Sequence, residues 1–428
     1  MSQQIRLYGC SNVDLYDINT KLGEGTFGQV YQGTFKPSGT AVALKEIIVH
    51  ERDEGIPITA LREIKIMKAL KHPNVLHILD MAVKKGDKSR SDKKTLSTYY
   101  MVMKYMDHDL CGLLHNKSVR FTLSHIKLYM SQLLQGMEFL HDQQYMHRDI
   151  KSANVLVGND GSIKIADFGL ARKYYEVPPS STETHPAERK YTPKVVTRWY
   201  RPPELLLGEQ FYTPAIDMWG IGCIFGEFFK RQVIMPGSSD TDQIQQIFKL
   251  LGSPSEKNMP NYSILPFTKE IMPIPQYPRA FDNVFNNVPT EARDLLAGFL
   301  CYDPMRRLTA KGALKHTFFT EGVQAADPKD LPSFPSSREM DVRRKRQASP
   351  PPNNQRKHVE RSDRRGGNNI PRAFAPKVWN KRELSKYEQI PPYRRQQQKE
   401  VRSQYTKETQ IAANPINEPE PMRNGLDY

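Results

Sequence analysis

The chain has 428 residues and a net charge of +15, with 62 Lys and Arg against 47 Asp and Glu. That length is sufficient for two or three domains and a large core. No apolar run approaches the roughly 18 residues that span a membrane, and the first ten residues lack the apolar centre of a secretion signal. The four cysteines are far apart and lack metal-ligand spacing. We therefore expect a soluble protein inside the cell, with no membrane contact and with reduced cysteines.

A glycine-rich stretch lies near the start of the chain. Residues 22–30 read LGEGTFGQV, which matches G-x-G-x-x-G-x-V between two strand-like segments. Such a match alone also fits a hairpin turn or a dinucleotide site. Here a further strand, not a helix, leads to Lys45. This context favours a hairpin that covers phosphates, with a lysine on the next strand that reaches them.

A helix is predicted to begin near Pro57, since proline suits the first helical turn. At about 100° per residue, one face of this helix would pack on the core; it holds Glu63, Ile66, Met67 and Leu70. Ile58 and Leu61 fall on the other side. They are either ordinary surface residues or residues that a partner covers.

The next segments alternate between polar loops and regular structure. Residues 84–94 form a basic, polar loop, and residues 99–105 a strand that would end in a linker between two lobes. Thr122 is a candidate N-cap. Apolar residues then recur at helical spacing from Ile126 to Leu140 and predict a core helix.

Residues that can carry chemistry concentrate between His147 and Gly169. Asp149 can accept a hydroxyl proton, and Asn154 and Asp167 offer the hard oxygen ligands that suit magnesium. Two short β-rich segments around a Gly-Asn-Asp-Gly turn predict a hairpin with these groups on its flanking loops. Singly, each would more often be a turn or cap residue. The complete set, H-R-D-x-K-x-x-N followed by D-F-G, indicates phosphoryl transfer.

The rest of the chain changes character twice. Residues 170–204 are rich in Pro, Ser and Thr, as in a surface loop, and helical patterns then continue to Phe319. From residue 321 the chain holds 22 Lys and Arg against 14 Asp and Glu, a net charge of +8, with little apolar periodicity. We expect disorder there. The basic cluster at 343–346 is either solvated charge or a site for nuclear import or nucleic acid.

Taken together, these motifs resemble a eukaryotic Ser/Thr protein kinase over residues 18 to about 320. The resemblance implies an α+β fold of two lobes. A small β-rich N-lobe with one main helix would cover about 18–105, and a larger, mainly helical C-lobe about 106–320. Residues 1–17 would form an N-terminal extension, and residues 321–428 a disordered basic tail rich in Pro, Gln and Asn.

The sequence PITALRE at 57–63 resembles the cyclin-binding helix of cyclin-dependent kinases, in the spelling of the positive transcription elongation factor b kinase and its fungal Bur-type relatives. This implies a cyclin over Ile58 and Leu61 and a nuclear location. Val195, Thr197 and Arg201 resemble the segment that selects proline after the target Ser or Thr. The implied substrates are Ser/Thr-Pro sites in the C-terminal domain of the largest RNA polymerase II subunit and in other elongation or chromatin factors.

The same resemblance implies ATP and magnesium as cofactors. Lys45, oriented by Glu63, would hold the phosphates, and Asn154 and Asp167 the magnesium. Asp149 would accept the substrate proton while Lys151 steadies the transferring phosphoryl group. Met103 would lie behind the adenine and Met106 and Asp107 beside it. The remaining nucleotide contacts would be Leu22, Gly23, Glu24, Gly25, Thr26, Phe27, Gly28 and Val30.

Regulation is implied by a second set of residues. Thr192 stands where an upstream activating kinase phosphorylates the family, and a phosphate there would be bound by arginines, namely Arg62, Arg148 and Arg172. Glu204 would pair with Arg307, and Asp217 would brace the catalytic loop. No role is predicted for Arg198.

Three alternatives remain to be compared with this interpretation. Cell-cycle kinases usually carry Tyr where this chain has Phe27, and mitogen-activated kinases carry a Thr-x-Tyr pair that is absent around Thr192. An inactive kinase-fold scaffold would usually lack an equivalent of Lys45, Asp149 or Asp167, and all three are present.

Overall fold

The computed structural model describes residues 10–25, 28–47, 56–85 and 97–341. The chain divides into two units, Met1–Ser349 and Pro350–Tyr428, and all described residues belong to the first. No helix in the described ranges is both long enough and apolar enough to cross a membrane. The four cysteines are free thiols, in agreement with the prediction.

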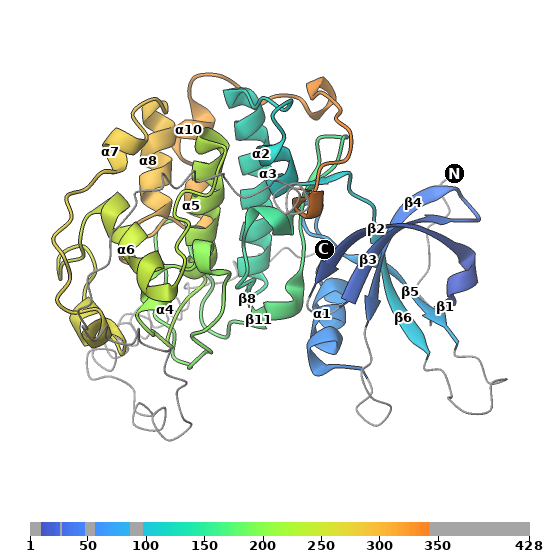
Figure 1. Ribbon diagram of the computed structural model, residues 1–428, viewed down its shortest axis with the longest axis horizontal. Helices are drawn as coiled ribbons and strands as arrows, with labels where there is room; N and C mark the ends of the chain where they lie inside the picture. Colours follow the sequence, from blue (N-terminus) through green and yellow to red (C-terminus); the bar gives the residue numbers. More distant parts are fainter. Residues whose placement is uncertain (1–9, 26–27, 48–55, 86–96, 342–428) are drawn as a thin grey trace, which may run out of the picture. The chain divides into compact units, whose positions relative to one another are not determined.

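A six-stranded sheet forms the N-lobe (Figure 1). Its strand order is β1-β5-β6-β4-β3-β2, and only the β1–β5 pair is parallel. The strands are β1 (Ser11–Asn12), β2 (Tyr16–Gly25), β3 (Gly28–Phe35), β4 (Thr40–Ile47), β5 (Ile78–Lys84) and β6 (Thr98–Lys104). Since β2 and β3 pair up to Gly25 opposite Gly28, the glycine-rich stretch is the predicted hairpin.

The predicted N-terminal extension is wrong for residues 11–17. Strand β1 pairs with β5, and Val13 and Tyr16 are buried in an apolar cluster that includes Val42, Leu44 and Val102. The Tyr16 hydroxyl also donates to Asp80 Oδ2 at 2.7 Å. These residues complete the core of the sheet, so the N-lobe begins earlier than the motifs suggest.

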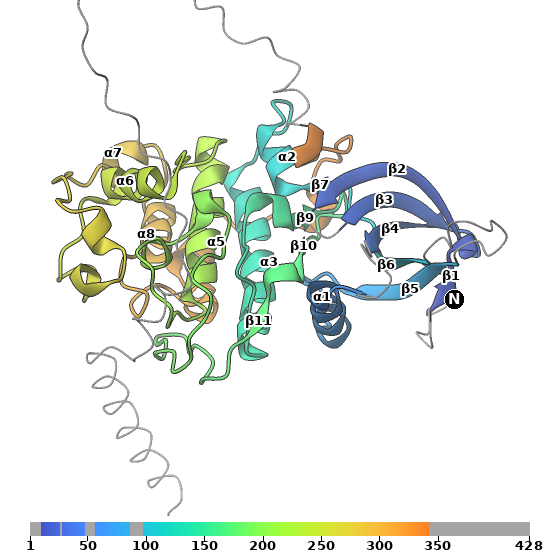
Figure 2. The same ribbon diagram turned by 60° about the horizontal axis from the view of Figure 1, so that its bottom comes forward.

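Helix α1 (Ile58–Ala69) lies beside the sheet, next to β5 (Figure 2). It packs against β5 and a 3₁₀ turn, η3 (Phe168–Leu170). The predicted inner face is confirmed, because Glu63, Ile66, Met67 and Leu70 are all buried. Ile58 and Leu61 are 72% and 46% exposed. The helix thus leaves an apolar pair uncovered.

Helices dominate the C-lobe, as expected. They are α2 (Leu110–His115), α3 (Leu123–Asp142), α4 (Pro203–Leu206), α5 (Ala215–Lys230), α6 (Asp240–Leu251), α7 (Phe281–Val284), α8 (Thr290–Phe299), α9 (Ala310–Ala313) and α10 (Thr317–Thr320). The Thr122 hydroxyl accepts from His125 N at 3.2 Å, so the predicted cap of α3 is confirmed. Helix α3 packs on α9 and α10, and α5 on α8.

Short strands at the junction of the lobes carry the loops of interest. Strands β9 (Val155–Val157) and β10 (Ile163–Ile165) form the predicted hairpin, and β7 (His108–Asp109) joins β9. Strands β8 (Tyr145–Met146) and β11 (Arg172–Lys173) pair at the two ends of this region. The loop from 147 to 154 and the turn after β10 therefore lie close together.

Part of the predicted disordered tail is ordered on the domain. Ser337 N donates to His108 Nδ1 at 3.1 Å, and Glu339 N donates to Asp109 Oδ2 at 2.8 Å. A Cβ on Gly112 would lie 2.4 Å from the Ser337 carbonyl oxygen, so only glycine permits this approach. The expectation of disorder from residue 321 is thus wrong for this segment. Residues 342–428, with the basic cluster, lie outside the described residues.

Candidate active site

An ion pair joins the sheet to α1. Lys45 Nζ on β4 lies 2.6 Å from Glu63 Oε1 and 3.8 Å from Asp167 Oδ1. Burial acts to lower the pKa of Lys45, but the carboxylates of Glu63 and Asp167 outweigh it and raise the pKa above its ordinary value. The lysine is therefore a fixed positive charge at the base of the cleft.

The loop after β8 gathers a second polar group. Asp149 Oδ2 accepts from Lys151 Nζ at 2.8 Å and from Asn154 Nδ2 at 3.1 Å. Its other oxygen, Oδ1, accepts from Thr197 N at 3.0 Å and from Thr197 Oγ1 at 2.6 Å. Thr197 Oγ1 also accepts from Lys151 Nζ at 3.1 Å. One carboxylate is thus held by the catalytic loop and by the segment that follows residue 190.

Asp217 on α5 binds the backbone of the loop that follows β8. Its two carboxylate oxygens accept from His147 N at 2.9 Å and Arg148 N at 2.8 Å. Burial works to raise the pKa of Asp217, but the hydrogen bond and charge of His141 hold it below its ordinary value. Because Arg148 adopts a left-handed φ of 65°, the backbone bonds also fix a conformation that costs energy. The predicted bracing role is confirmed.

The predicted pair between Glu204 and Arg307 is also present. Arg307 Nη1 and Nη2 donate to the two Glu204 oxygens at 2.7 and 2.9 Å, and both residues are buried. This bidentate pair ties the start of α4 to the segment before α9.

A cavity of about 230 Å³ lies between the two polar groups. Eleven of the predicted site residues line it, namely Leu22, Gly23, Glu24, Gly28, Val30, Lys45, Glu63, Met103, Met106, Asn154 and Asp167. A Cβ on Gly28 would lie 1.8 Å from the Glu46 carbonyl oxygen, so the turn of the hairpin requires glycine there. Gly25 ends β2, and Thr26 and Phe27 lie outside the described residues.

Asp107 does not line this cavity. Its carboxylate accepts from Asn159 N at 2.8 Å, and its carbonyl oxygen accepts from Ser336 Oγ at 2.8 Å. The neighbouring Met106 carbonyl oxygen accepts from the Arg338 guanidinium. The backbone predicted to meet adenine is therefore already bonded to the segment after residue 333.

The donor set fits magnesium. Asn154 Nδ2 donates to Asp149, which turns the amide oxygen to the opposite side, and Asp167 presents a half-exposed carboxylate. No cluster of three His, Cys, Asp or Glu side chains that could bind a metal occurs in the described part of the chain. One or two oxygen ligands with substrate phosphates are the usual magnesium environment. Asn154 and Asp167 match that pattern.

Comparison with known proteins agrees with this geometry. Residues 16–319 match the family described as protein kinase domain. The chain belongs to the protein kinase family. It is 46% identical over 353 residues to a probable cyclin-dependent kinase 9 of Schizosaccharomyces pombe, with 80% of this chain and 58% of that protein covered. It is 47% identical over 342 residues to a Bur-type serine/threonine-protein kinase of Yarrowia lipolytica, with 79% and 48% covered.

A solved structure supports the same placement. The yeast RNA Pol II CTD kinase CTDK-1 complex contains a chain that is 38% identical, with a TM-score of 0.62, and the match covers 76% of this kinase and 97% of that chain. The kinase therefore falls in the branch of the Bur-type kinases and cyclin-dependent kinase 9, as the PITALRE helix suggested. The chain spans about half the length of the curated relatives it matches first.

The activation segment of this kinase contains Thr192, which is exposed. Arg148 Nη1 donates to the Tyr212 hydroxyl at 3.0 Å, and that hydroxyl donates to the Thr192 carbonyl oxygen at 2.8 Å. The Arg172 guanidinium lies 5.5 Å from the centre of the Tyr191 ring. Arg148 and Arg172 thus contact the neighbourhood of Thr192. Arg62 is exposed on α1, which packs on η3 near Arg148.

A strained residue lies next to Thr197. Val196 has a φ of 68°, which is unfavourable for a β-branched side chain. Arg201 donates to its carbonyl oxygen at 3.0 Å and to that of Val195 at 2.9 Å. Asp240 binds both Arg201 and Arg198 at 3.0 Å. Arg198, which had no predicted role, therefore helps to hold α6 against this segment.

Several residues of the site were not foreseen. Ala43, Leu76, Leu156 and Ala166 line the 230 Å³ cavity, together with Asp109 and Arg338. The apolar four look like any core residue in the sequence. Arg338 lies far along the chain and follows no motif, so no local signal marks it.

Glu227 on α5 provides a test by pH. This carboxyl is buried, and burial raises its pKa from 4.5 to about 7 despite hydrogen bonds from Tyr200 and Ser152. The folded state then binds more protons than the unfolded state between those values, so stability falls as pH rises from about 5 to about 8, by about 3 kcal/mol. Urea unfolding at about pH 5 and about pH 8 should show this loss of stability in the wild type. Glu227→Gln should not show it. Glu321→Gln, at an exposed position, should keep it; equal slopes in all three proteins would contradict the assignment.

Proposed function

We propose that this chain is a cyclin-dependent Ser/Thr kinase that transfers the γ-phosphate of ATP to Ser/Thr-Pro sites. The observation that carries the proposal is the convergence of Lys45, Glu63 and Asp167 on one cavity, whose wall also holds Asn154. Asn154 in turn donates to Asp149, which pairs with Lys151. Phosphoryl transfer requires this combination of positioning and charge neutralisation.

Each residue then has a defined role in the proposal. Lys45 binds the phosphates, and Glu63 keeps it in place. Asn154 and Asp167 hold magnesium, which when bound neutralises the charge that develops on the phosphates. Asp149 orients the substrate hydroxyl and accepts its proton, while Lys151 stabilises the transferring group. The adenine lies between Val30 and the other residues of the cavity wall, beside Met103 and Met106.

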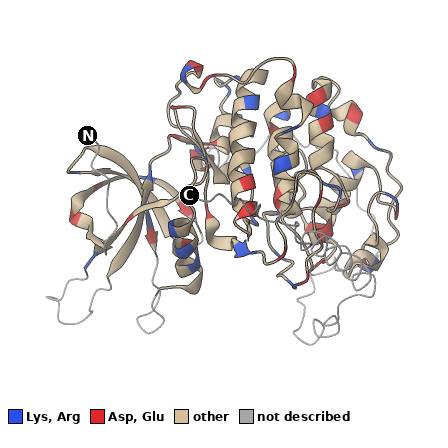
Figure 3. Ribbon diagram, turned by 180° about the vertical axis from the view of Figure 1, so that it is seen from behind, with Lys and Arg blue, Asp and Glu red and all other residues tan. Residues whose placement is uncertain are grey.

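A cyclin is proposed as the partner that covers the outer side of α1. Burying Ile58 and Leu61 offers about 3 to 6 kcal/mol. Shifting a helix from 1% to 99% in its inward position requires about 5.5 kcal/mol, so the two amounts are comparable. Arg62, Lys65 and Lys68 are also exposed on α1, and Figure 3 colours Lys and Arg blue along the ribbon. The covering surface should therefore combine apolar and acidic groups.

Proline selection follows from the strained residue beside Thr197. Arg201 donates a hydrogen bond to the Val196 carbonyl oxygen. The backbone amide hydrogen of the substrate residue after the target Ser or Thr would therefore find no acceptor there. Proline has no amide hydrogen and avoids this cost. We propose the repeats of the RNA polymerase II C-terminal domain as leading substrate, because the similar CTDK-1 complex is an RNA Pol II CTD kinase. A nuclear location, and import or nucleic-acid contact through the cluster at 343–346, belong to the same proposal.

Phosphorylation of Thr192 by an upstream kinase should activate the enzyme. The added charge would be bound by Arg148 and Arg172, and by Arg62 from α1. Since one to three charge-assisted hydrogen bonds are at stake, Thr192→Ala should lower the turnover of the cyclin complex at least about tenfold. Thr182→Ala, an exposed threonine of the same segment, is the matched control. Near-normal turnover of purified Thr192→Ala would remove this residue from the role.

The proposed function as a whole is tested on the complex isolated with the tagged chain. We expect transfer of phosphate to polymerase repeat peptides and none to peptides in which each proline after Ser or Thr is replaced. Equal use of both peptides would favour a kinase without proline selection. A cyclin-loaded preparation that transfers no phosphate would instead favour the inactive scaffold, and activity restricted to other Ser/Thr-Pro peptides would favour a cell-cycle or mitogen-activated kinase.

A further inference from the structure

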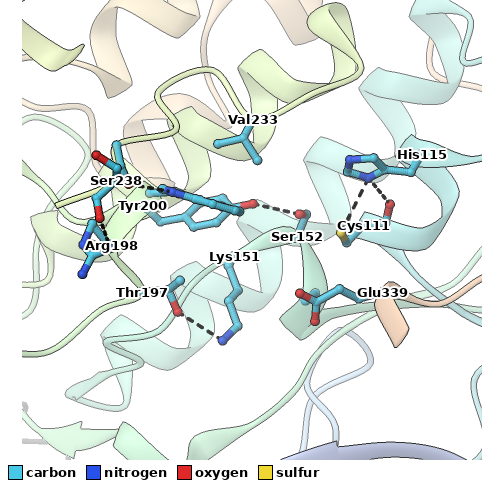
Figure 4. Close-up of a pocket in the computed structure, with 13 residues that line it drawn as sticks. Cys111, His115, Lys151, Ser152, Thr197, Arg198, Tyr200, Val233, Ser238 and Glu339 are labelled. Carbon is cyan, nitrogen blue, oxygen red and sulfur yellow. Dashed lines mark hydrogen bonds between the residues drawn. The ribbon is translucent and has the colours of Figure 1, made fainter. Parts of the chain in front are cut away.

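A second cavity, of about 570 Å³, adjoins the catalytic loop on the side of α2 (Figure 4). Lys151 and Thr197 line it, and both bind the Asp149 carboxylate. Cys111 and His115 of α2 line another part, and Glu339 comes from the ordered C-terminal segment. In Figure 4 the Glu339 carboxylate is turned toward the side on which Lys151 lies. The cavity therefore combines catalytic residues with a carboxylate that no kinase motif includes.

Glu339 is held in this place by its own backbone. Its amide donates to Asp109 Oδ2 at 2.8 Å, and Gly112 N donates to Asp109 Oδ1 at 2.7 Å. Asp109 is buried, so one carboxylate binds the C-terminal segment to the first turn of α2. Ser337, two residues earlier, is anchored on His108. Backbone hydrogen bonds of the segment thus anchor the main chain of Glu339 beside α2.

The α2 side of this cavity favours a positive charge. Burial raises the pKa of the Cys111 thiol to about 12, and the negative charges of Asp109, Glu339 and Glu227 add to the effect. The two cations on the opposite wall are already compensated, because Lys151 pairs with Asp149 and Arg198 with Asp240. An added cation near Glu339 would therefore meet carboxylates, while an added anion would be repelled.

The direction in which a substrate peptide binds brings residues on the N-terminal side of the target Ser or Thr to the Glu339 carboxylate. In the proposed function the hydroxyl lies at Asp149 and the following proline at Val196 and Arg201. Neither Val196 nor Arg201 lines the cavity, whereas Lys151 and Thr197 do. The proline follows the target residue, so the part of the peptide that extends in the opposite direction is its N-terminal side. The residues that precede the target Ser or Thr therefore lie in the cavity.

We propose that this cavity is a subsite in which Glu339 selects a lysine or arginine on the N-terminal side of the phosphorylated Ser or Thr. The inference rests on the proposed function and adds a preference, among Ser/Thr-Pro sites, for those that a basic residue precedes. It also gives the ordered C-terminal segment a part in substrate choice.

The test uses the full chain in complex with its cyclin. A Ser-Pro peptide of otherwise uncharged residues is compared with peptides in which a single lysine is moved through the positions before the serine. For a partly exposed charge pair, kcat/KM should rise about fivefold at one or two positions, mainly through KM. Glu339→Gln should reduce this preference to about one, and Glu339→Lys should shift it to a glutamate at the same positions. Asp330→Asn, an exposed carboxylate of the same segment, should keep the wild-type ratio.

Two results would overturn the subsite. One is equal use of the lysine and uncharged peptides by the wild type. The other is a Glu339→Gln enzyme with an altered KM for ATP but an unchanged peptide ratio, which would assign the side chain to the nucleotide. In both, phosphorylation of the uncharged Ser-Pro peptide leaves the proposed function standing. Absence of transfer to every peptide would overturn both proposals together.

Discussion

Asp149→Asn is expected to lower kcat by about 10²–10⁴-fold, the range that a positioned general base contributes. The carboxylate is nearly buried and is bound by Lys151, Asn154 and Thr197. Asparagine has the same shape and can keep part of this bonding, but it cannot accept the substrate proton. Steady-state assays of the cyclin complex with a Ser-Pro peptide give the effect, and thermal unfolding of each protein shows whether the domain remains folded.

Asp160→Asn is the matched control for this experiment. Asp160 lies on the turn of the β9–β10 hairpin, about half exposed, and pairs with Lys104 at 2.8 Å. Since this exposed pair contributes at most about 1 kcal/mol, the substitution should leave kcat near the wild-type value. An Asp149→Asn enzyme that retains a tenth or more of wild-type kcat, with its fold intact, would remove Asp149 from the role of base.

Local spacing was enough to predict that the candidate catalytic groups lie close together, because they come from short, ordered motifs. Asp149, Lys151 and Asn154 lie on one loop, and Asp167 follows the adjacent strand, so chain geometry alone brings them together. The inner face of α1 was predictable for a similar reason, since helical periodicity relates Glu63 to Ile66 and Leu70. Pairing of Glu63 with Lys45 needed family resemblance, because 18 residues separate them.

The contacts that were missed are long-range and depend on the backbone. Ser337 and Glu339 bind residues 229 and 230 positions earlier through main-chain amides, which any sequence possesses. In the sequence, only Gly112 indicates that the backbone of Ser337 comes close to α2. A single glycine can have many other causes. Val13 and Tyr16 were assigned to an extension because the kinase motifs begin after them, although both complete the core of the sheet. Sequence patterns therefore outline the catalytic centre better than the segments that enclose it.

Leu61→Glu is expected to weaken cyclin binding at least about 100-fold. Burial of a leucine contributes about 1.5 to 3 kcal/mol, and an uncompensated glutamate in the same contact adds a desolvation cost. The exposed position of Leu61 means that the free kinase should lose little stability. Binding of purified cyclin measures the first effect, and thermal unfolding of the free chain measures the second.

The kinase activity of Leu61→Glu should fall in parallel with its loss of cyclin binding. Without cyclin, α1 is uncovered and the Lys45–Glu63 pair has no external support. Ile264→Glu introduces the same charge at an exposed apolar residue of the C-lobe, and it should leave both binding and activity near wild type. Saturating cyclin should restore part of the activity of Leu61→Glu, because the substitution acts on affinity and not on the catalytic groups. Full activity of Leu61→Glu without bound cyclin would show that α1 holds Glu63 against Lys45 unaided, and the cyclin-driven switch would then be wrong.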